Sequence, residues 1–341
     1  MEVFQLSPEI PFRFHPTPPK FPNRSRINFC RPLSATSDSR SRNRMFVLGM
    51  GFVGGFFAEK LKEADWVVSG ACRSDSKKEE WEKKGIDLHL FSADSPEWSL
   101  LETVKKDYTH LLVSIPPLAD IGDPMLRDVE LVREKLSSGN LQWLCYLSST
   151  SVYGDYGGAW VTEDHPPNPK TQSAKLRLAA EEGWLSLGSD LGVSTHVLRL
   201  GGIYGPGRSA IDTLLKRENL SESQLRRASR RFTSRVHVED ICQALQAAIE
   251  KPSSREIYNI VDDDPAPREE VFEYALEMIE KRWKRKIETK PFLYESREQS
   301  SLRGEKRVSN EHMKDKLGVK LLYPSYKLGL QSIGEKMDNP F

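Results

Sequence analysis

Cysteines are few in this chain of 341 residues, and no two of them have the spacing of a metal site or a redox pair. The four cysteines are Cys30, Cys72, Cys145 and Cys242, and no C-x-x-C pair occurs. Cys72 and Cys145 fall in apolar runs that are typical of strands. We therefore expect buried free thiols rather than disulfides, and no metal centre.

The chain also lacks a long apolar run and an excess of charge of one sign. No stretch approaches the roughly 20 apolar residues that a helix needs to cross a bilayer, so no membrane span is expected. The 50 basic residues are balanced by 49 acidic ones, which gives no support for a general attraction to nucleic acids or membranes. The length suits one large α/β domain with a smaller appendage, or two domains.

The first 44 residues lack any amphipathic period and are rich in proline instead. They contain seven prolines, eight basic residues and three acidic ones, and residues 34–44 are rich in serine and arginine. This composition predicts a cleavable transit peptide over residues 1–44, and it favours a chloroplast stroma over a mitochondrion. Glu2 and Glu9 are atypical of such peptides. The alternative is a disordered tail on a cytoplasmic protein.

The segment 45–55, MFVLGMGFVGG, is the most informative part of the chain. Its first four residues are apolar and predict a short buried parallel strand. Helical periodicity follows over residues 52–64. Between them stand three glycines at G-x-G-x-x-G spacing, namely Gly49, Gly51 and Gly54. A glycine turn between a strand and a helix, at the start of a β-α-β pattern, indicates dinucleotide binding.

Each glycine of this turn has its own structural role. Gly49 permits the tight turn out of the strand, Gly51 lets the backbone approach a pyrophosphate, and Gly54 allows the helix to pack closely. The first helical residues, Phe52 and Val53, then present free N–H groups and a partial positive charge to the phosphates. We expect all five residues to form the cofactor site. A purely structural turn is the alternative.

Apolar runs and amphipathic stretches alternate along the chain after residue 44. The expected strands are 45–48, 66–72, 87–91, 110–114, 142–147 and 194–200, and the expected helices between them include 52–64, 123–136 and 173–187. Strands that alternate with helices predict a parallel sheet with right-handed crossovers. The fold class is therefore α/β, with a doubly wound parallel Rossmann sheet.

The alternation loosens after Leu200, which suggests a second lobe. We expect residues 45–200 to form the NAD(P)-binding Rossmann domain and residues 201–341 to form mostly a C-terminal lobe that covers the substrate. Within this half, a helix (238–250), a strand (257–260) and a second helix (268–282) are expected, and some elements return to the Rossmann sheet. Ligands of such folds bind at the carboxyl ends of the strands.

The end of the second expected strand carries Arg73 and Ser74 in place of the acid that binds the ribose in NAD-binding proteins. An acid would repel a 2′-phosphate, whereas Arg73 can pair with it bidentately and Ser74 can add a hydrogen bond. We therefore expect NADP(H) rather than NAD(H). The alternative is that Arg73 caps a strand end while Asp75 reaches the ribose. Asp94 is a candidate partner of the adenine amino group, or a helix cap.

The run LSSTSVYG at 147–154, taken with the glycine turn, resembles the extended short-chain dehydrogenase/reductase superfamily, which includes sugar-nucleotide epimerases and dehydratases. Further matches follow in the right order, namely RLGGIYGPG at 199–207, RVHVED at 235–240 and YNI at 258–260. The resemblance covers about residues 45–330. The segments SIPP at 114–117 and GDP at 122–124 are similar to a YeeZ-like subgroup.

The resemblance implies roles for several residues. Ser149, four residues before Tyr153, would bind the carbonyl or hydroxyl group of a small-molecule substrate. Ser114 and Pro116 would contact the cofactor. Two further residues in the later motifs would contact the substrate, namely Tyr204 and Arg235.

The family's main acid/base, the tyrosine of a Tyr-x-x-x-Lys pair, is missing from the corresponding stretch 169–181. One alignment register puts Ser173 in the place of the tyrosine and Arg177 in that of the lysine. The other register puts Thr171 and Lys175 there. A serine hydroxyl is a far weaker acid than a phenol, so Ser173 cannot replace it. Arg177 can hold the nicotinamide ribose but does not exchange protons usefully.

Three hypotheses follow from this absence. In the first, another group transfers the proton, namely Tyr153, Tyr156 or Tyr204 with Lys175 nearby, or a water held by Ser149. In the second, Ser149 and ordered water alone polarise the substrate of a slow reductase. In the third, the protein binds a nucleotide without chemistry, as a sensor, scaffold or RNA-associated plastid protein. We favour an oxidoreductase on a small carbonyl or hydroxyl compound. Among the possible functions, an epimerase or dehydratase ranks third, after the oxidoreductase and the protein without chemistry, because its reaction depends most on the tyrosine.

Basic residues gather at Arg226, Arg227, Arg230 and Arg231, shortly before Arg235. A solvated helix face explains the first four better than a grip on a phosphate or on RNA. Nucleic acid is therefore the less favoured partner. The protein is expected to be a monomer or a homodimer, and the helix 173–187 would supply one part of the four-helix interface that relatives use.

Overall fold

The computed structural model describes residues 43–92, 98–216, 232–284 and 305–340. The expected transit peptide, apart from its last two residues, lies outside the described residues, and so do Asp94 and the four arginines at 226–231. The prediction of a plastid address therefore stays a prediction. The contacts of the chain group Ser39–Phe341 into one unit, which contains all the elements below.

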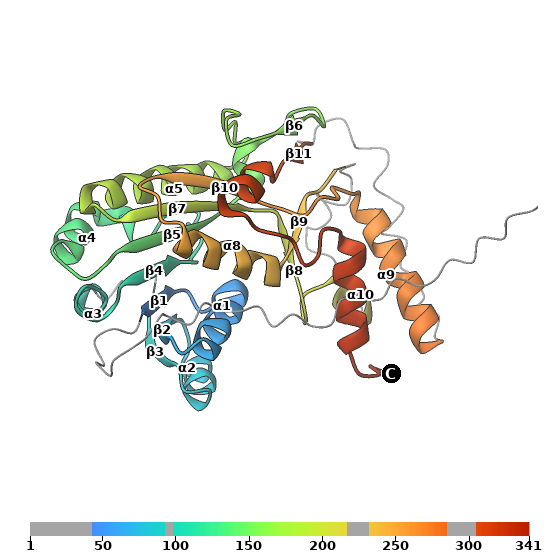
Figure 1. The fold of residues 1–341 in the computed structure, drawn as a ribbon, viewed down its shortest axis with the longest axis horizontal. Helices are drawn as coiled ribbons and strands as arrows, with labels where there is room; N and C mark the ends of the chain where they lie inside the picture. The colour runs from blue at the N-terminus through green and yellow to red at the C-terminus, as the bar shows by residue number, and fades with distance from the viewer. Residues whose placement is uncertain (1–42, 93–97, 217–231, 285–304, 341) are drawn as a thin grey trace, which may run out of the picture. The chain divides into compact units, whose positions relative to one another are not determined.

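A seven-stranded sheet forms the centre of this unit, and every pairing in it is parallel (Figure 1). Its strand order is β10-β7-β5-β4-β1-β2-β3. The strands are β1 (Arg44–Leu48), β2 (Val67–Cys72), β3 (Asp87–Leu90), β4 (His110–Val113), β5 (Trp143–Ser149), β7 (Ser194–Leu200) and β10 (Glu256–Ile260). This is the doubly wound order with one further strand at the β7 edge. The fold class predicted from the sequence is confirmed.

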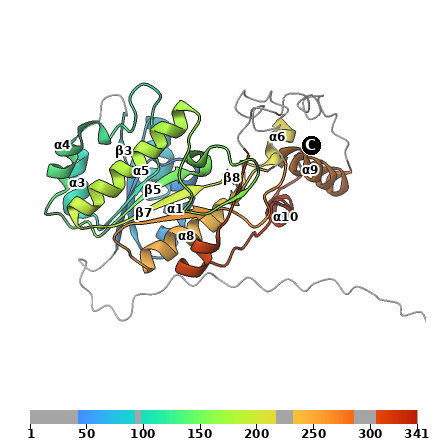
Figure 2. The ribbon, with the colours of Figure 1, turned by 90° about the horizontal axis from the view of Figure 1, so that it is seen from above.

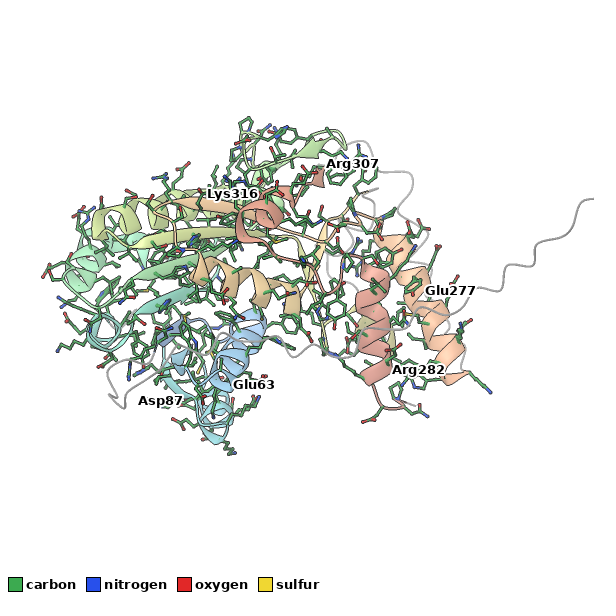
Figure 3. The ribbon with its side chains drawn as sticks, viewed as in Figure 1. Glu63, Asp87, Glu277, Arg282, Arg307 and Lys316 are labelled. Carbon is green, nitrogen blue, oxygen red and sulfur yellow. The ribbon has the colours of Figure 1, made fainter. Side chains whose placement is uncertain are left out.

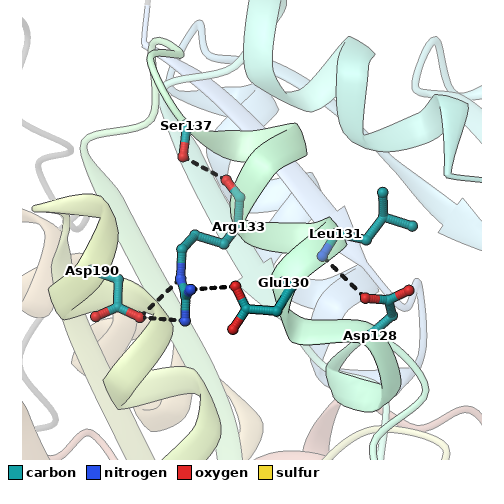
Figure 4. Close-up of polar contacts among 6 residues, drawn as sticks. All are labelled: Asp128, Glu130, Leu131, Arg133, Ser137 and Asp190. Atoms are coloured by element: carbon teal, nitrogen blue, oxygen red, sulfur yellow. Dashed lines mark hydrogen bonds and ion pairs between the residues drawn. The ribbon is translucent and has the colours of Figure 1, made fainter.

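Helices cover both faces of the sheet, as Figures 1 and 2 show. They are α1 (Phe52–Glu63), α2 (Asp75–Lys83), α3 (Ser99–Asp107), α4 (Val129–Leu136), α5 (Gln172–Leu191) and α8 (Val238–Glu250). Helices α1 and α8 pack against each other on one face, and α3, α4 and α5 pack in succession on the other. An exposed ion pair from Arg133 to Asp190 joins α4 to α5 (Figure 4).

One expected helix begins later than predicted. The segment expected as 123–136 contains a 3₁₀ turn, Leu126–Asp128, before α4 starts at Val129. The buried carboxylate of Asp123 accepts hydrogen bonds from the backbone N–H groups of Met125 and Leu126, and also from Trp184 Nε1. These bonds stabilise a turn at the start of the segment, because aspartate competes with helical hydrogen bonding for nearby backbone groups.

A second lobe follows β7 and lies to one side of the sheet (Figure 1). It contains α6 (Ala210–Lys216), α9 (Arg268–Trp283), α10 (Tyr326–Lys336) and a parallel pair of short strands, β8 (Gly202–Tyr204) and β9 (Arg235–His237). These helices share an apolar core that includes Ile211, Phe272 and Leu330. Another parallel pair joins β6 (Trp160–Val161) to β11 (Arg307–Val308). Helix α8 packs on the main sheet and β10 is part of it, so the chain leaves the second lobe after β9 and returns to it at α9.

The interior is mainly apolar and contains a few charged side chains, while most charged residues lie at the periphery. The largest fully buried side chains include those of Trp143 and Tyr146 on β5 and of Trp184 on α5. Figure 3 shows charged side chains such as those of Asp87 and Glu277 at the edges of the molecule. None of the helices in the described ranges is long and apolar enough to span a bilayer.

Candidate functional site

The glycine turn lies between β1 and α1. Gly49 has a φ of +108°, a conformation that side-chain-bearing residues rarely adopt. A Cβ atom on Gly54 would lie 2.5 Å from the carbonyl oxygen of Gly49, so this position requires glycine for packing. A Cβ atom on Gly51 would come no closer than 4.0 Å to any neighbour, which leaves that side of the backbone open. The turn is thus closed on its inner side and accessible at Gly51.

Helix α1 begins beside this open backbone. Its N-cap is Gly51, which provides no side-chain cap, and its first turn has no acidic residue. The first N–H groups of a helix have no partner within the helix, and they carry the positive end of its dipole. An uncapped helix start next to a glycine turn fits the pyrophosphate of a dinucleotide. The residues at this turn therefore suit the cofactor that the sequence predicts.

A cavity of about 730 Å³ starts at this turn and extends into the second lobe. Among the predicted site residues, those that line it are Gly51, Phe52, Val53, Ser114, Pro116, Ser149, Arg177, Tyr204 and Arg235. Ser114 and Pro116 follow β4, which pairs with β1, so the cavity opens where the order of the sheet reverses. Ligands of doubly wound folds bind at this point. The volume is within the range of small-molecule sites.

Of the predicted site residues that the structure describes, five do not line the cavity. Gly49 and Gly54 form the inner side of the turn. Arg73 and Ser74 directly follow β2, and both are exposed. The register of β1 with β2 pairs Leu48 with Ala71, and the N–H group of Met50 donates to the Ala71 carbonyl at 2.9 Å. Arg73 therefore follows the strand end to which the glycine turn is bonded. The fifth residue, Tyr153, is described below.

The start of α5 bears on the two alignment registers for the missing pair. Thr171 is the N-cap of α5, and its Oγ1 accepts the N–H of Ala174 at 3.3 Å. Ser173 and Lys175 are exposed. Arg177 lines the cavity, and its Nη1 donates to the carbonyl of Leu147 at 3.3 Å. The geometry favours the register with Arg177 in the place of the lysine, and it leaves Ser173 outside the lining.

The candidate tyrosines are poorly suited to proton transfer in the cavity. Tyr153 is fully buried, donates to Asn259 Oδ1 at 2.8 Å and lies under the Arg199 guanidinium, so it is a packed interior residue. Tyr156 donates to the carbonyl of Pro166. Tyr204 does line the cavity, but burial, followed by the nearby Asp262 carboxylate, raises the pKa of its phenol strongly. A higher pKa makes a phenol a still weaker acid.

Charged side chains distinguish the part of the cavity in the second lobe. The cationic lining residues are Arg177, Arg208, Lys216, Arg235, Arg268 and Lys306, and Asp212 is the acidic residue of the described lining. Arg235 Nη1 donates to the Thr233 carbonyl at 2.7 Å, and Lys306 Nζ donates to that of Gly154 at 3.0 Å. In the described lining, cationic side chains therefore outnumber the acidic one, which suits an anionic ligand.

Sequence analysis identified only Arg177 and Arg235 among these cations. Arg208 directly follows the RLGGIYGPG motif, so its position was a usable signal. Lys216, Arg268 and Lys306 come from segments with no motif. Only the folding of the second lobe brings them to the same cavity.

A buried carboxylate also lies behind the cavity, and sequence analysis missed it. Glu181 of α5 is 1% exposed and accepts a hydrogen bond from the hydroxyl of Ser148, which lines the cavity. Arg199 of β7 binds the same carboxylate, with Nη2 at 2.8 Å from Oε2. Glu181 follows Arg177 by four residues, so both lie on one side of α5. That spacing was the available signal.

Comparison with known proteins decides the family of the chain. Residues 45–261 match the model of the NAD dependent epimerase/dehydratase family. The chain belongs to this family. Protein YeeZ from Escherichia coli K12 is 28% identical over 225 residues, which cover 64% of this chain and 77% of that protein. The predicted resemblance to extended short-chain dehydrogenases/reductases and to their YeeZ-like subgroup is confirmed.

Solved structures support the same fold. A functionally unknown conserved protein from Silicibacter pomeroyi is 28% identical, with a TM-score of 0.68 over 87% of this chain and 100% of that one. UDP-glucose 4-epimerase from Thermotoga maritima, solved with UDP-glucose, has a TM-score of 0.68 at 17% identity and covers 86% and 100%. dTDP-glucose 4,6-dehydratase from Bacillus anthracis, solved with NAD, has 0.66 at 18%, covering 86% and 96%. The family is described as NAD dependent, and the Bacillus anthracis dehydratase was solved in complex with NAD.

Proposed function

We propose that the protein is an NADP(H)-dependent oxidoreductase that acts on a small anionic carbonyl or hydroxyl compound. One observation carries the proposal, namely that a single cavity runs from the glycine turn past Ser149 to a group of cations. A bound nicotinamide would supply or accept a hydride in this cavity. The protein's own residues would bind, orient and polarise the substrate.

Preference for NADP(H) is supported by the charges at the end of β2. Arg73 is exposed beyond the last residue of this strand, and Ser74 is an N-cap whose side chain caps no backbone N–H group of α2. A guanidinium and a hydroxyl at this place favour a 2′-phosphate over a bare ribose hydroxyl. Structural neighbours are in complex with NAD and do not support this preference. The preference for the phosphorylated cofactor therefore rests on Arg73 and Ser74.

An anionic substrate is supported by the second-lobe part of the cavity. Its cations outnumber the carboxylate of Asp212, and a charged group fixed there would bring a neighbouring carbonyl toward Ser149. The Ser149 hydroxyl accepts the N–H of Ser151 at 3.2 Å, which holds its oxygen in place at the end of β5. In this role Ser149 donates a hydrogen bond to the substrate oxygen.

NADPH oxidation with a panel of carbonyl compounds tests the proposal. Aldehydes and ketones that carry a phosphate or a carboxylate are compared with uncharged compounds of the same length. We expect the anionic compounds to have the lower KM. Lys216→Glu, which reverses a charge in the cavity, should raise that KM, whereas the exposed Lys281→Glu of α9 should not. Absence of NADPH oxidation with every compound would contradict the proposal.

A second candidate is a nucleotide-binding protein without catalytic activity. It is favoured by the position of Ser173, which is exposed where the family places its tyrosine. This candidate predicts that NADPH binds and that no carbonyl is reduced. Binding of RNA that weakens steeply with salt would identify an RNA-associated role. Epimerase or dehydratase activity on a sugar nucleotide is supported by the family and by the neighbours' names, but it ranks third because it depends most on the missing tyrosine.

A further inference from the structure

A serine that lines the cavity is bonded to the buried carboxylate behind it. Ser148 and Ser149 are the last two residues of β5, and both line the cavity. The Ser148 hydroxyl donates its hydrogen to Glu181 Oε1. Ser148 is 4% exposed and Glu181 is 1% exposed, so bulk water has little access to this bond. Ser148 thus connects the lining of the cavity to a buried carboxylate.

Three separate elements hold this pair in place. Ser148 on β5 is the register partner of Arg199 on β7, and Glu181 reaches them from α5. Arg199 binds the Glu181 carboxylate through Nη2 at 2.8 Å and through Nε at 3.2 Å. Such bidentate pairing fixes the direction of a carboxylate as well as its charge. Glu181 therefore has little freedom to turn away from the Ser148 hydroxyl.

Stability alone is a weak reason for this arrangement. A buried ion pair is commonly no more stabilising than apolar residues of the same volume, because both charges must be desolvated. Here the pair also receives a hydroxyl from the wall of the cavity. No tyrosine among the cavity-lining residues of the described ranges is suited to proton exchange, since Tyr326 donates to Glu270 and burial raises the pKa of its phenol.

We propose that Ser148 and Glu181 form the proton-transfer pair of this cavity, in the place of the tyrosine that the family uses. The inference rests on the proposed oxidoreductase function. In the oxidising direction the O–H bond of the substrate breaks and its proton binds Ser148 Oγ, while the proton of Ser148 passes to Glu181 Oε1. The C–H bond of the carbon that carries this hydroxyl also breaks, and its electron pair leaves as the hydride that the oxidised nicotinamide would accept. Reduction reverses each step.

Two other groups face the carboxylate from neighbouring strands. Arg199 on β7 is in direct contact, and the buried phenol of Tyr146 on β5 is close enough for its charge to interact with that of Glu181. Neither competes as a proton source, because guanidinium does not deprotonate usefully and burial raises the pKa of Tyr146. Reduction takes up one proton for each carbonyl reduced, so its rate should rise as the pH falls, and oxidation should show the opposite trend.

Ser148→Ala is the decisive variant, because it removes the relay oxygen and leaves the Glu181–Arg199 pair intact. The matched control is Ser173→Ala, which makes the same change at an exposed position of α5. For both we measure kcat for NADPH oxidation from pH 5 to 9, NADPH affinity by tryptophan fluorescence, and Tm. We expect Ser148→Ala to lower kcat by about 100-fold or more and to lose the pH trend. Its NADPH affinity should stay within about twofold, and the control should match the wild type.

The possible results separate this inference from the function on which it rests. If the wild type reduces a carbonyl and Ser148→Ala is as active, or keeps the pH trend, the pair is overturned while the proposed function stands. If the wild type binds NADPH and reduces no carbonyl in the panel, the proposed function and the pair both fail. Glu181→Gln should reproduce the loss, but it leaves Arg199 unpaired, so Ser148→Ala decides.

Discussion

Two ion pairs show how burial sets the value of a single residue. Arg199 and Glu181 have side chains that are 3% and 1% exposed, and their closest atoms are 2.8 Å apart. Arg133 and Asp190, drawn in Figure 4, are almost as close at 2.9 Å but are 36% and 40% exposed. Water screens the second pair, whereas loss of one partner from the first leaves a buried charge. Distance alone therefore says little about energy.

We expect Arg199→Met to lower the free energy of unfolding by about 3–5 kcal/mol, because it leaves the Glu181 carboxylate buried without its partner. Arg133→Met should lower it by less than about 1 kcal/mol. Urea denaturation of the two variants, followed by circular dichroism, measures both values. Equal losses in the two variants would contradict this assignment of the buried pair.

The Arg73 side chain carries the prediction of cofactor choice. Arg73→Glu should weaken NADPH binding by at least about tenfold, since one charge-assisted hydrogen bond is lost and a repulsion is gained. NADH, which lacks the 2′-phosphate, should bind as before or more tightly. Lys83→Glu, at the other end of α2, is the control for the change of charge. Fluorescence titrations give all these dissociation constants. Equal weakening for both cofactors would contradict the role of Arg73.

At the scale of elements, the sequence predicted the strands well because buried parallel strands are continuous apolar runs. The seven strands of the central sheet begin and end within two residues of the expected positions. Helices α2 and α3 were not among the named helices, and the charged sequence of α2 buries a single residue, Trp81. The sequence predicted the second lobe without its short strands β8 and β9. These strands pair across about 30 residues of sequence and show little periodicity of their own.

The residues of the site likewise divide into those that the sequence predicted and those that it did not. The glycine turn and Ser149 were predictable, because local motifs define them. Lys216 and Lys306 reach the cavity only through the packing of distant elements, which a single sequence does not encode as a pattern. The Ser148–Glu181–Arg199 contact joins β5, α5 and β7, and its residues look ordinary until the sheet register is known. The sequence shows the residue types, but it does not show which distant residues come into contact.

Two glycines of the α1 turn should respond differently to the same substitution. Gly54→Ala brings a Cβ within 2.5 Å of the backbone oxygen of Gly49, so α1 must shift and the Tm should fall. Gly51→Ala finds open space, so the Tm should hardly change. Its methyl group would occupy the space of the pyrophosphate and weaken NADPH binding by about tenfold or more. A matching loss of Tm in both variants would contradict the distinction.

At the scale of the whole molecule, a row of rings crosses the sheet. Trp66, His110 on β4, Trp143 on β5, His196 on β7 and Tyr258 on β10 follow one another at centroid distances of 4.9, 5.9, 5.9 and 6.1 Å. Burial lowers the pKa of both histidines to about 4. Because unfolded histidine has a pKa of about 6.5, the unfolded state binds more protons between these values. Each histidine therefore destabilises the fold as the pH falls from 6.5 to 4.

His196→Phe should remove this acid sensitivity at one position while keeping an aromatic ring between Trp143 and Tyr258. From pH 7 to pH 4, the unfolding free energy of the variant relative to wild type should rise by about 3 kcal/mol, which corresponds to the lowered pKa of His196. Asp240, whose pKa burial raises to about 6, acts in the opposite direction but is present in both proteins and cancels. Urea titrations at several pH values measure the difference. A constant difference across this range would contradict the prediction.

Binding of the cofactor is the claim on which the proposed chemistry depends. The most direct measurement is a titration of the purified full-length protein with NADPH and, separately, with NADH, following energy transfer from its tryptophans. We predict tight binding of NADPH and markedly weaker binding of NADH, in agreement with the glycine turn and with Arg73. If a folded sample bound neither nucleotide, the turn would be a structural feature only, and the oxidoreductase function would be contradicted.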